Sequence, residues 1–429
     1  MKGMKIFVLS LLITITSNSI FAFGISYLGE INPIVRYQTS DNSLIELPFR
    51  ISKLDLNIYH NNIELQTNVA LETRYDDFEA TEFQLRELYF HWYPKFGEVK
   101  IGKIIHAWGL ADQNNPTDNL NPYNFYYLFG TGVDRKIGSW SGTVSIDLGN
   151  FNIESVFIPV HNPNTLPLNE TDLPIATLPD SGFKMLEIEN PYEYGIRLRH
   201  NILGFDYSIS YLHCYDRNPT NLGITKYGAP FFLGYKKNDI VGLDILRFVG
   251  DFTIRAESAY FFSSNFYDST LFALKFKQDV QYLQYVIQVE YDSPFDIKFT
   301  TQFMQNYIVS AEGSGWDMQN REHSTDLESF FIPGVGIPFL SFMKRSISLS
   351  ATKTFFDDRL ELKTFTLLDL EELDEFSGQM ISFGSKLFFW QNFEADLSYL
   401  WIIGNDDPNN FMTKMENFSH LSLGFKYSF

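Results

Sequence analysis

The chain has 429 residues, a formal net charge of −19 and a single cysteine, Cys214. One thiol cannot close an internal disulfide, and the basic residues do not cluster as nucleic-acid binding requires, so a disulfide scaffold and a nucleic-acid partner are excluded. There are 42 Phe and 24 Tyr residues, yet the mean hydropathy is only −0.13. Many aromatic residues, with no apolar run of about 18 residues beyond the N-terminus, are typical of a membrane β-barrel.

The N-terminus has the parts of a secretory signal peptide. Lys2 and Lys5 form a positive segment, and residues 6–15 form an apolar run that is too short to span a membrane. We therefore predict a signal peptide at 1–22 and one exported domain at 23–429. The alternative is an uncleaved helical anchor, which the lack of stop-transfer charges disfavours.

Apolar and polar residues alternate with a period of two along most of the remaining chain, and helical spacing is scarce. In residues 205–211 (FDYSISY), aromatic and aliphatic side chains share one face, and Asp and Ser share the other. Aromatic residues toward lipid and charges toward a lumen fit this pattern. A sheet in lipid must also close, because an open edge leaves backbone groups unpaired. The residues that we expect to face lipid include Tyr207, Ile209, Tyr211, Ile254, Tyr285, Ile287, Phe299, Leu423 and Phe425.

Short and long connections alternate along the chain. Short turns are expected at 61–62 and 149–150, for example, and long loops at about 107–134 and 263–279. Short periplasmic turns and long outer loops are the asymmetry of outer-membrane barrels. With a first strand at roughly 25–38, the connections delimit about 18 strands, or 16 as an alternative. We predict an all-β fold consisting of a single closed antiparallel transmembrane β-barrel.

The last strand supports this prediction. Leu421, Leu423, Phe425, Tyr427 and Phe429 occupy alternate positions, and the sequence stops at Phe429. An amphipathic final strand with a terminal Phe resembles the assembly signal of bacterial outer-membrane proteins. We therefore expect binding to the outer-membrane assembly machinery through this strand. We also expect the barrel to lie in the outer membrane of a Gram-negative-type bacterium, in contact with its lipid and lipopolysaccharide.

A structured loop follows the strand that contains Lys103, and Asn-Pro pairs fix its turns. Together with 193–199 (EYGIRLR) and 246–260, this arrangement resembles an outer-membrane β-barrel family of unknown function related to alginate-export-type porins. The resemblance implies an exported barrel with a lumen, without a known substrate. Lys103-Ile104 departs from the Arg-Gln that the family favours, so the resemblance implies no polar contact at that position.

The loop also supplies three candidates for a constriction: Trp108, Asp112 and Asp118. If the loop folds inward, these residues narrow the lumen. If it folds outward, Trp108 and the Asn-Pro turns only brace an outer loop. Both hypotheses remain open, because long ordered loops often carry function but need not.

Alternation places a set of polar side chains on the lumen wall. Charged rings select solutes in channels, whereas cross-strand ion pairs that only stiffen the barrel are the alternative, which we favour for any single residue. We expect Asp206 and Glu257 to hold the wall arginines, and we expect replacement of Gln288 to cost little stability. The pore-lining candidates are Arg197, Arg199, Asp206, Arg255, Glu257, Gln284, Gln288, Lys298, Lys363 and Lys386.

We predict no enzymatic activity, cofactor or metal site. The 8 histidines are scattered, and no metal-ligand spacing, nucleophile elbow or P-loop occurs. The predicted function is a porin-like channel or export pore that passes a small polar or anionic solute through a loop-narrowed lumen. Two alternatives stay open. One is a transporter of hydrophobic compounds, for which the apolar segment 330–340 is a candidate, and the other is a non-conducting structural or adhesive barrel.

Overall fold

The computed structural model describes residues 23–429 except 76, 113, 177–182, 225–230, 270–273, 317–321, 325–330 and 373–374. The expected signal peptide lies outside the described residues. The strands are β1 (Gly24–Ile31), β2 (Ile34–Gln38), β3 (Phe49–His60), β4 (Ile63–Thr73), β5 (Glu82–Trp92), β6 (Gly97–Ile104), β7 (Ser139–Leu148), β8 (Phe151–Ile158), β9 (Phe183–Met185), β10 (Glu193–Ile202), β11 (Phe205–Tyr215), β12 (Thr220–Ile224), β13 (Phe231–Gly234), β14 (Lys237–Val249), β15 (Phe252–Ser269), β16 (Leu274–Asp292), β17 (Ile297–Trp316), β18 (Glu322–Ser324), β19 (Arg345–Phe355), β20 (Leu360–Glu372), β21 (Glu375–Trp390), β22 (Phe393–Ile403) and β23 (His420–Ser428).

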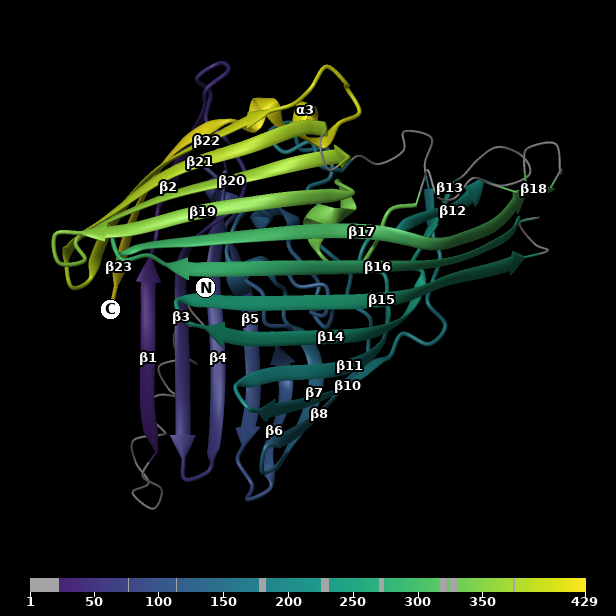
Figure 1. Ribbon diagram of the computed structural model, residues 1–429, viewed down its shortest axis with the longest axis horizontal. Helices are drawn as coiled ribbons and strands as arrows, with labels where there is room; N and C mark the ends of the chain where they lie inside the picture. Colours follow the sequence, from purple (N-terminus) through teal and green to yellow (C-terminus); the bar gives the residue numbers. More distant parts are fainter. Residues whose placement is uncertain are drawn as a thin grey trace.

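Eighteen antiparallel strands close into one barrel (Figure 1), which confirms the predicted fold. β1 and β2 together form the first strand. β1 pairs with β3, and residues from Gly29 to Gln38 pair with the last strand, β23, and with Phe429. The first strand is interrupted at Pro33, because proline has no N–H for a ladder. Each barrel strand has partners on both sides, as a sheet in lipid requires.

The connections have the predicted asymmetry. In Figure 1, β3 to β8 and β14 to β22 run in clearly different directions, as opposite walls of a tilted barrel do. Short turns join the strands along the left side and the bottom of the view, and α3 and the loop after β2 lie at the top, at the opposite end of the strands. The tight turns use left-handed backbone at Asn61 (φ 53°), Gly149 (φ 70°) and Gly250 (φ 59°).

One expected loop is wrong. Residues 263–279 are mostly strand, because β15 continues to Ser269 and β16 begins at Leu274. Ser263, Ser264 and Asn265 still pair with β16. Their polar side chains end the apolar alternation but not the ladder, so the sequence pattern marked the edge of the apolar belt instead of the end of the strand.

In the part of the chain that the structure describes, helical structure is confined to short segments outside the strands. They are η1 (Phe78–Ala80), η2 (Phe125–Tyr127), η3 (Gly132–Arg135), η4 (Pro338–Ser341), α3 (Phe411–Met415) and η5 (Glu416–Phe418). Among the described residues, no helix has the length and apolar character needed to cross a membrane.

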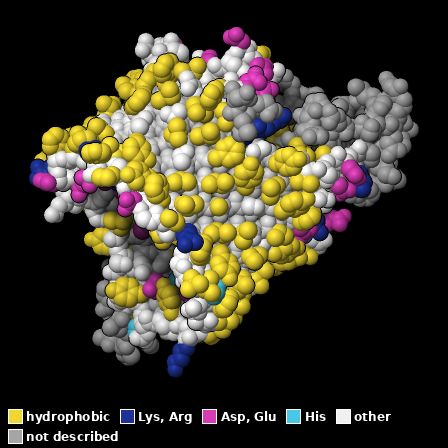
Figure 2. Space-filling view, in the orientation of Figure 1, with side chains coloured by type: hydrophobic (Ala, Val, Ile, Leu, Met, Phe, Trp, Pro, Cys, Tyr) yellow, Lys and Arg dark blue, Asp and Glu magenta, His cyan; other side chains and the backbone are white. Residues whose placement is uncertain are grey.

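The outer surface of the barrel is apolar. In Figure 2 a broad band of hydrophobic side chains covers the visible wall, and most charged side chains lie toward its ends. The residues predicted to face lipid fit this surface, since the three tyrosines among them are half-buried and the others are exposed. The strand faces follow directly from the period of two.

The outer half of the barrel interior is packed. One apolar cluster joins wall residues of β16 to β22, including Met304, Leu367 and Met380, to residues of five connections between strands. A second cluster joins Trp108 and Val335 to the wall of β8 to β16. The long connections therefore fold into the barrel and bury their apolar side chains there. The loop members of the first cluster are Ile45, Leu47, Ala111, Tyr123, Phe125, Leu128, Leu173, Ile337, Phe339, Leu340, Met343, Phe411, Met412, Met415 and Phe418.

Candidate pore and constriction

The connection between β6 and β7, residues 105–138, lies inside the barrel and reaches the opposite wall; we call it the inserted loop. The N–H of Asp112 donates to Gln288 Oε1 (2.8 Å), and Gln302 Nε2 donates to the carbonyl of Asp112 (2.6 Å). The N–H of Gly336, from another long connection, donates to Asn119 Oδ1 (2.7 Å). The inserted loop thus spans the lumen from β6 to β16 and β17.

Glu257 of β15 is a major anchor of the inserted loop. Its carboxylate accepts hydrogen bonds from the N–H groups of Leu110 and Ala111, from Thr117 Oγ1 (2.8 Å) and from Asn115 Nδ2 (3.3 Å). Glu257 is only 2% exposed. A buried carboxylate is tolerated when several donors satisfy it. The expectation that Glu257 holds a wall arginine is therefore wrong, because it holds the backbone of the loop.

Arg197 supports the same loop from the adjoining wall. Its guanidinium donates to Glu154 (2.9 Å) and lies 5.2 Å from the centre of the Trp108 ring. Trp108 Nε1 donates to the same carboxylate (3.1 Å). Arg197 is 6% exposed and Trp108 is 2% exposed. The structure thus places both residues in packing contacts, away from the open part of the lumen.

The other two wall arginines also have partners that the sequence analysis did not choose. Arg199 keeps half of its side chain exposed and donates to Asn152 (2.7 Å). Arg255 forms ion pairs with Glu290 of β16 and with Asp112 of the inserted loop (3.3 Å). Alternation along a strand predicts which side chains face the lumen. It does not predict which loop residues those side chains contact.

The remaining wall candidates divide into loop contacts and more open positions. Gln284 Oε1 accepts from the N–H of Ile337 (2.9 Å). Gln288 is 0% exposed and also bonds Asp112, Glu290 and Gln302, so the structure gives it more contacts than the expectation of a low replacement cost assumed.

The other four wall candidates lie nearer the short turns. Lys298 pairs with Glu290 (2.7 Å), and Lys386 lies 3.9 Å from Glu394. Lys363 is exposed, and Asp206 accepts a hydrogen bond from Asn201.

Two further polar residues of the inserted loop are buried. Asp118 forms an ion pair with Lys136, and both are almost fully buried. His106 contacts Ser141 Oγ (2.9 Å), and burial lowers the pKa of its imidazole to about 3, so the ring is neutral at physiological pH. Of the three constriction candidates, Asp112 alone has an exposed side chain, at 57%.

A polar hollow of about 560 Å³ remains between the inserted loop and the wall of β3 to β6; we call it the basic hollow. Arg86 donates to Asp134 of η3 (2.8 Å), and Lys53 Nζ lies 3.0 Å from the same carboxylate. Arg50 lies 3.8 Å away, and Lys103 Nζ donates only to the carbonyl of Leu85 (2.7 Å) among the contacts described. The basic residues that line the hollow itself are Arg50, Arg74, Arg86, Lys103 and Lys136, with Glu72 and Glu82 as acidic ones.

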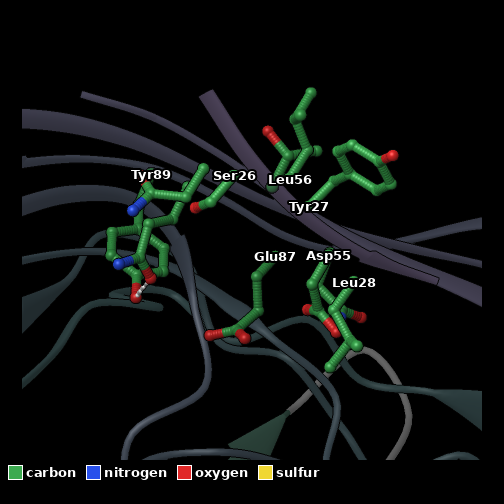
Figure 3. Close-up of a pocket in the computed structure, with 11 residues that line it drawn as sticks. Ser26, Tyr27, Leu28, Asp55, Leu56, Glu87 and Tyr89 are labelled. Carbon is green, nitrogen blue, oxygen red and sulfur yellow. Dashed lines mark hydrogen bonds between the residues drawn. The ribbon is translucent and has the colours of Figure 1, made fainter. Parts of the chain in front are cut away.

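A second hollow of about 320 Å³ follows on the same wall (Figure 3); we call it the acidic hollow. The carboxylates of Asp55 and Glu87 point into it, whereas Tyr27 and Leu56 point away. Asp55 lies two residues beyond Lys53 on the lumen face of β3, so the acidic hollow is nearer the short turns. The charge on the wall therefore changes from mainly basic to acidic toward the short turns.

Comparisons with known proteins bear on the fold. No protein-family model matches the chain, and no curated protein is significantly similar to it. Among solved structures, OccAB3 of Acinetobacter baumannii is similar, with a TM-score of 0.52, 9% identity, and coverage of 95% of this chain and 99% of that chain. So is OccK2 of Pseudomonas aeruginosa in complex with glucuronate, with a TM-score of 0.51, 10% identity, and coverage of 95% and 97%.

The chain shares the closed β-barrel fold of these two proteins. At such low identity the likeness shows the fold alone.

The sequence analysis missed the basic hollow. Arg50, Lys53 and Arg86 occupy polar strand positions just as the chosen arginines do, and only the path of the inserted loop distinguishes them. One pattern was available, because asparagine recurs in the loop from 114 to 124. Asn121 Nδ2 donates to the carbonyls of Ile104 and Ile137 (both 2.9 Å). Side chains that satisfy a loop's own backbone allow that loop to be buried.

Proposed function

We propose that the chain is a porin-like outer-membrane channel, and that small polar or anionic solutes pass along the wall of β3 to β6. One observation carries the proposal: Arg50, Lys53 and Arg86 converge on a single loop carboxylate, Asp134, beside an open hollow. Three cations around one carboxylate give a positive potential, which low-dielectric walls strengthen. Packing of the opposite side of the lumen supports this route.

The order of the two hollows favours passage of an anion over its tight retention. An anion entering from the outer side meets the basic hollow first, where Lys103 and its neighbours stabilise it. The carboxylates of Asp55 and Glu87 follow and weaken its binding. Conduction requires binding that is favourable enough for entry and weak enough for release.

The two alternatives make different predictions. The apolar segment proposed for a hydrophobic transporter contains Val335, Ile337 and Phe339 among its described residues, and these side chains pack in the apolar clusters. These side chains fill space inside the barrel, which favours a polar route for the solute. A non-conducting barrel remains the second alternative, and the resemblance to alginate-export-type porins stays part of the channel proposal.

The test is conductance of the purified chain in planar bilayers under a salt gradient. We expect open channels with anion preference, and glucuronate, which the structurally similar OccK2 binds, is a suitable first blocker. Lys103→Gln should shift the reversal potential toward cation preference without disturbing Asp134. The control Arg199→Ser, outside the route, should shift it much less. Absence of current supports the structural barrel, and equal shifts in both variants contradict the route.

A further inference from the structure

An apolar hollow of about 570 Å³ lies on the outer face of the barrel, across β17 and β19 to β23; we call it the outer groove. Ala351, Thr364 and Ser385 are small residues that face outward here. Around them stand larger side chains such as Phe383 and Leu397, which are exposed. The hollow arises because small side chains interrupt a surface otherwise built from large ones. Its volume falls within the roughly 300–1,000 Å³ of small-ligand sites.

Strand register gives the outer groove a direction. One row of paired residues runs from Lys353 through Leu362 and Ser385 to Leu397. Lys353 lies beside the short turn that follows β19, whereas Leu397 is farther from the turn that precedes β22. The groove therefore begins near the rim of short turns and climbs toward the middle of the apolar belt.

A cation stands at the rim end of the outer groove. Lys353 pairs in register with Ile297, so both side chains face outward. Lys353 Nζ lies 5.1 Å from the centre of the Phe355 ring. Lysine extends its ammonium toward the membrane interface when its stem lies on apolar surface, and aromatic residues favour the same level. An anionic headgroup at this level complements the charge of Lys353.

We propose that the outer groove binds one phospholipid of the periplasmic leaflet. One acyl chain lies over Ala351, Thr364 and Ser385, and the phosphate contacts the ammonium of Lys353. The groove lies in the apolar belt and is therefore surrounded by lipid. An acyl chain that fits the groove gains dispersion contacts that a flat wall does not offer. This inference does not rest on the proposed channel function.

The experiment is native mass spectrometry of the full chain released from detergent micelles that contain dipalmitoyl phosphatidylglycerol. We expect one retained lipid per chain. Thr364→Phe fills the groove and should abolish retention, whereas Leu349→Phe, also outward-facing but outside the groove, should not. Lys353→Gln should lower retention about five-fold. Lys386→Gln, on the lumen face of β21 and not among the residues that line the groove, should leave it unchanged.

Fold is checked for every variant by the shifted gel mobility of unheated barrels. If Thr364→Phe fails this check, Ser385→Leu replaces it. Equal retention in all folded variants overturns the proposal. So does a mass corresponding to two or three chains that Thr364→Phe converts to one, because the occupant is then a second copy of the chain.

Discussion

At the scale of single residues, Glu257 shows how one carboxylate positions a loop. Two backbone N–H groups and two side chains donate to it. In Glu257→Gln the new amide N–H groups meet other donors, and a buried donor without a partner costs about 1–3 kcal/mol. We expect that loss in denaturant unfolding, together with a larger and noisier single-channel current. The control Asp206→Asn, a partly exposed wall carboxylate, should cost less than about 0.5 kcal/mol, and an equal loss in both variants would contradict the anchoring role.

His106 makes stability depend on pH. Its folded pKa is about 3, because burial disfavours the charged ring, whereas an unfolded histidine has a pKa of about 6.5. Between these values the unfolded chain binds a proton that the folded chain does not. Stability therefore falls as pH drops from about 6.5 toward 3, by up to about 1.4 kcal/mol per pH unit. His106→Gln should remove this part of the slope between pH 7 and pH 5, and His60→Gln at a short turn should retain it. An unchanged slope in His106→Gln would show that the ring is not buried in solution.

At the scale of elements, each strand separates lipid from lumen by alternation. Leu349 faces outward and is exposed on the apolar surface, whereas Ser350 faces the lumen. We expect Leu349→Arg to cost about 2–4 kcal/mol in refolding titrations, as does Ile287→Arg, because the charge enters lipid near mid-membrane. Ser350→Arg should be nearly neutral. Similar losses for the two neighbours would reverse the face assignment.

The elements also show what the sequence can and cannot predict. A period of two and the short turns determine strand faces, strand number and closure, since each depends on local chemistry. The inserted loop depends on contacts between residues far apart, such as Glu257 with the backbone of Leu110. Backbone N–H groups occur at almost every residue, so they leave no pattern. The sequence thus indicated a loop with turn residues but not the wall that it covers.

At the scale of the whole molecule, Phe429 takes part in the closure of the barrel. Gly29 and Phe429 exchange backbone hydrogen bonds of 2.8 and 2.9 Å, which extends the seam between the first and last strands. We propose that Phe429 also serves recognition by the outer-membrane assembly machinery. Deleting Phe429 should lower the folded fraction in cells more than in detergent refolding, as measured by gel mobility. An equal loss in both settings would assign Phe429 to closure alone.

The central claim is that solutes pass along the wall of β3 to β6. The only cysteine, Cys214, is 0% exposed and is therefore shielded from thiol reagents. The reagent should not change the current of the chain without an added cysteine. Gln84→Cys places a thiol in the basic hollow, and Ser350→Cys places one on the wall across the lumen. With a charged thiol reagent in planar bilayers, the account predicts a large irreversible fall in current for Gln84→Cys and little change for Ser350→Cys. A current that falls for Ser350→Cys but not for Gln84→Cys would contradict it.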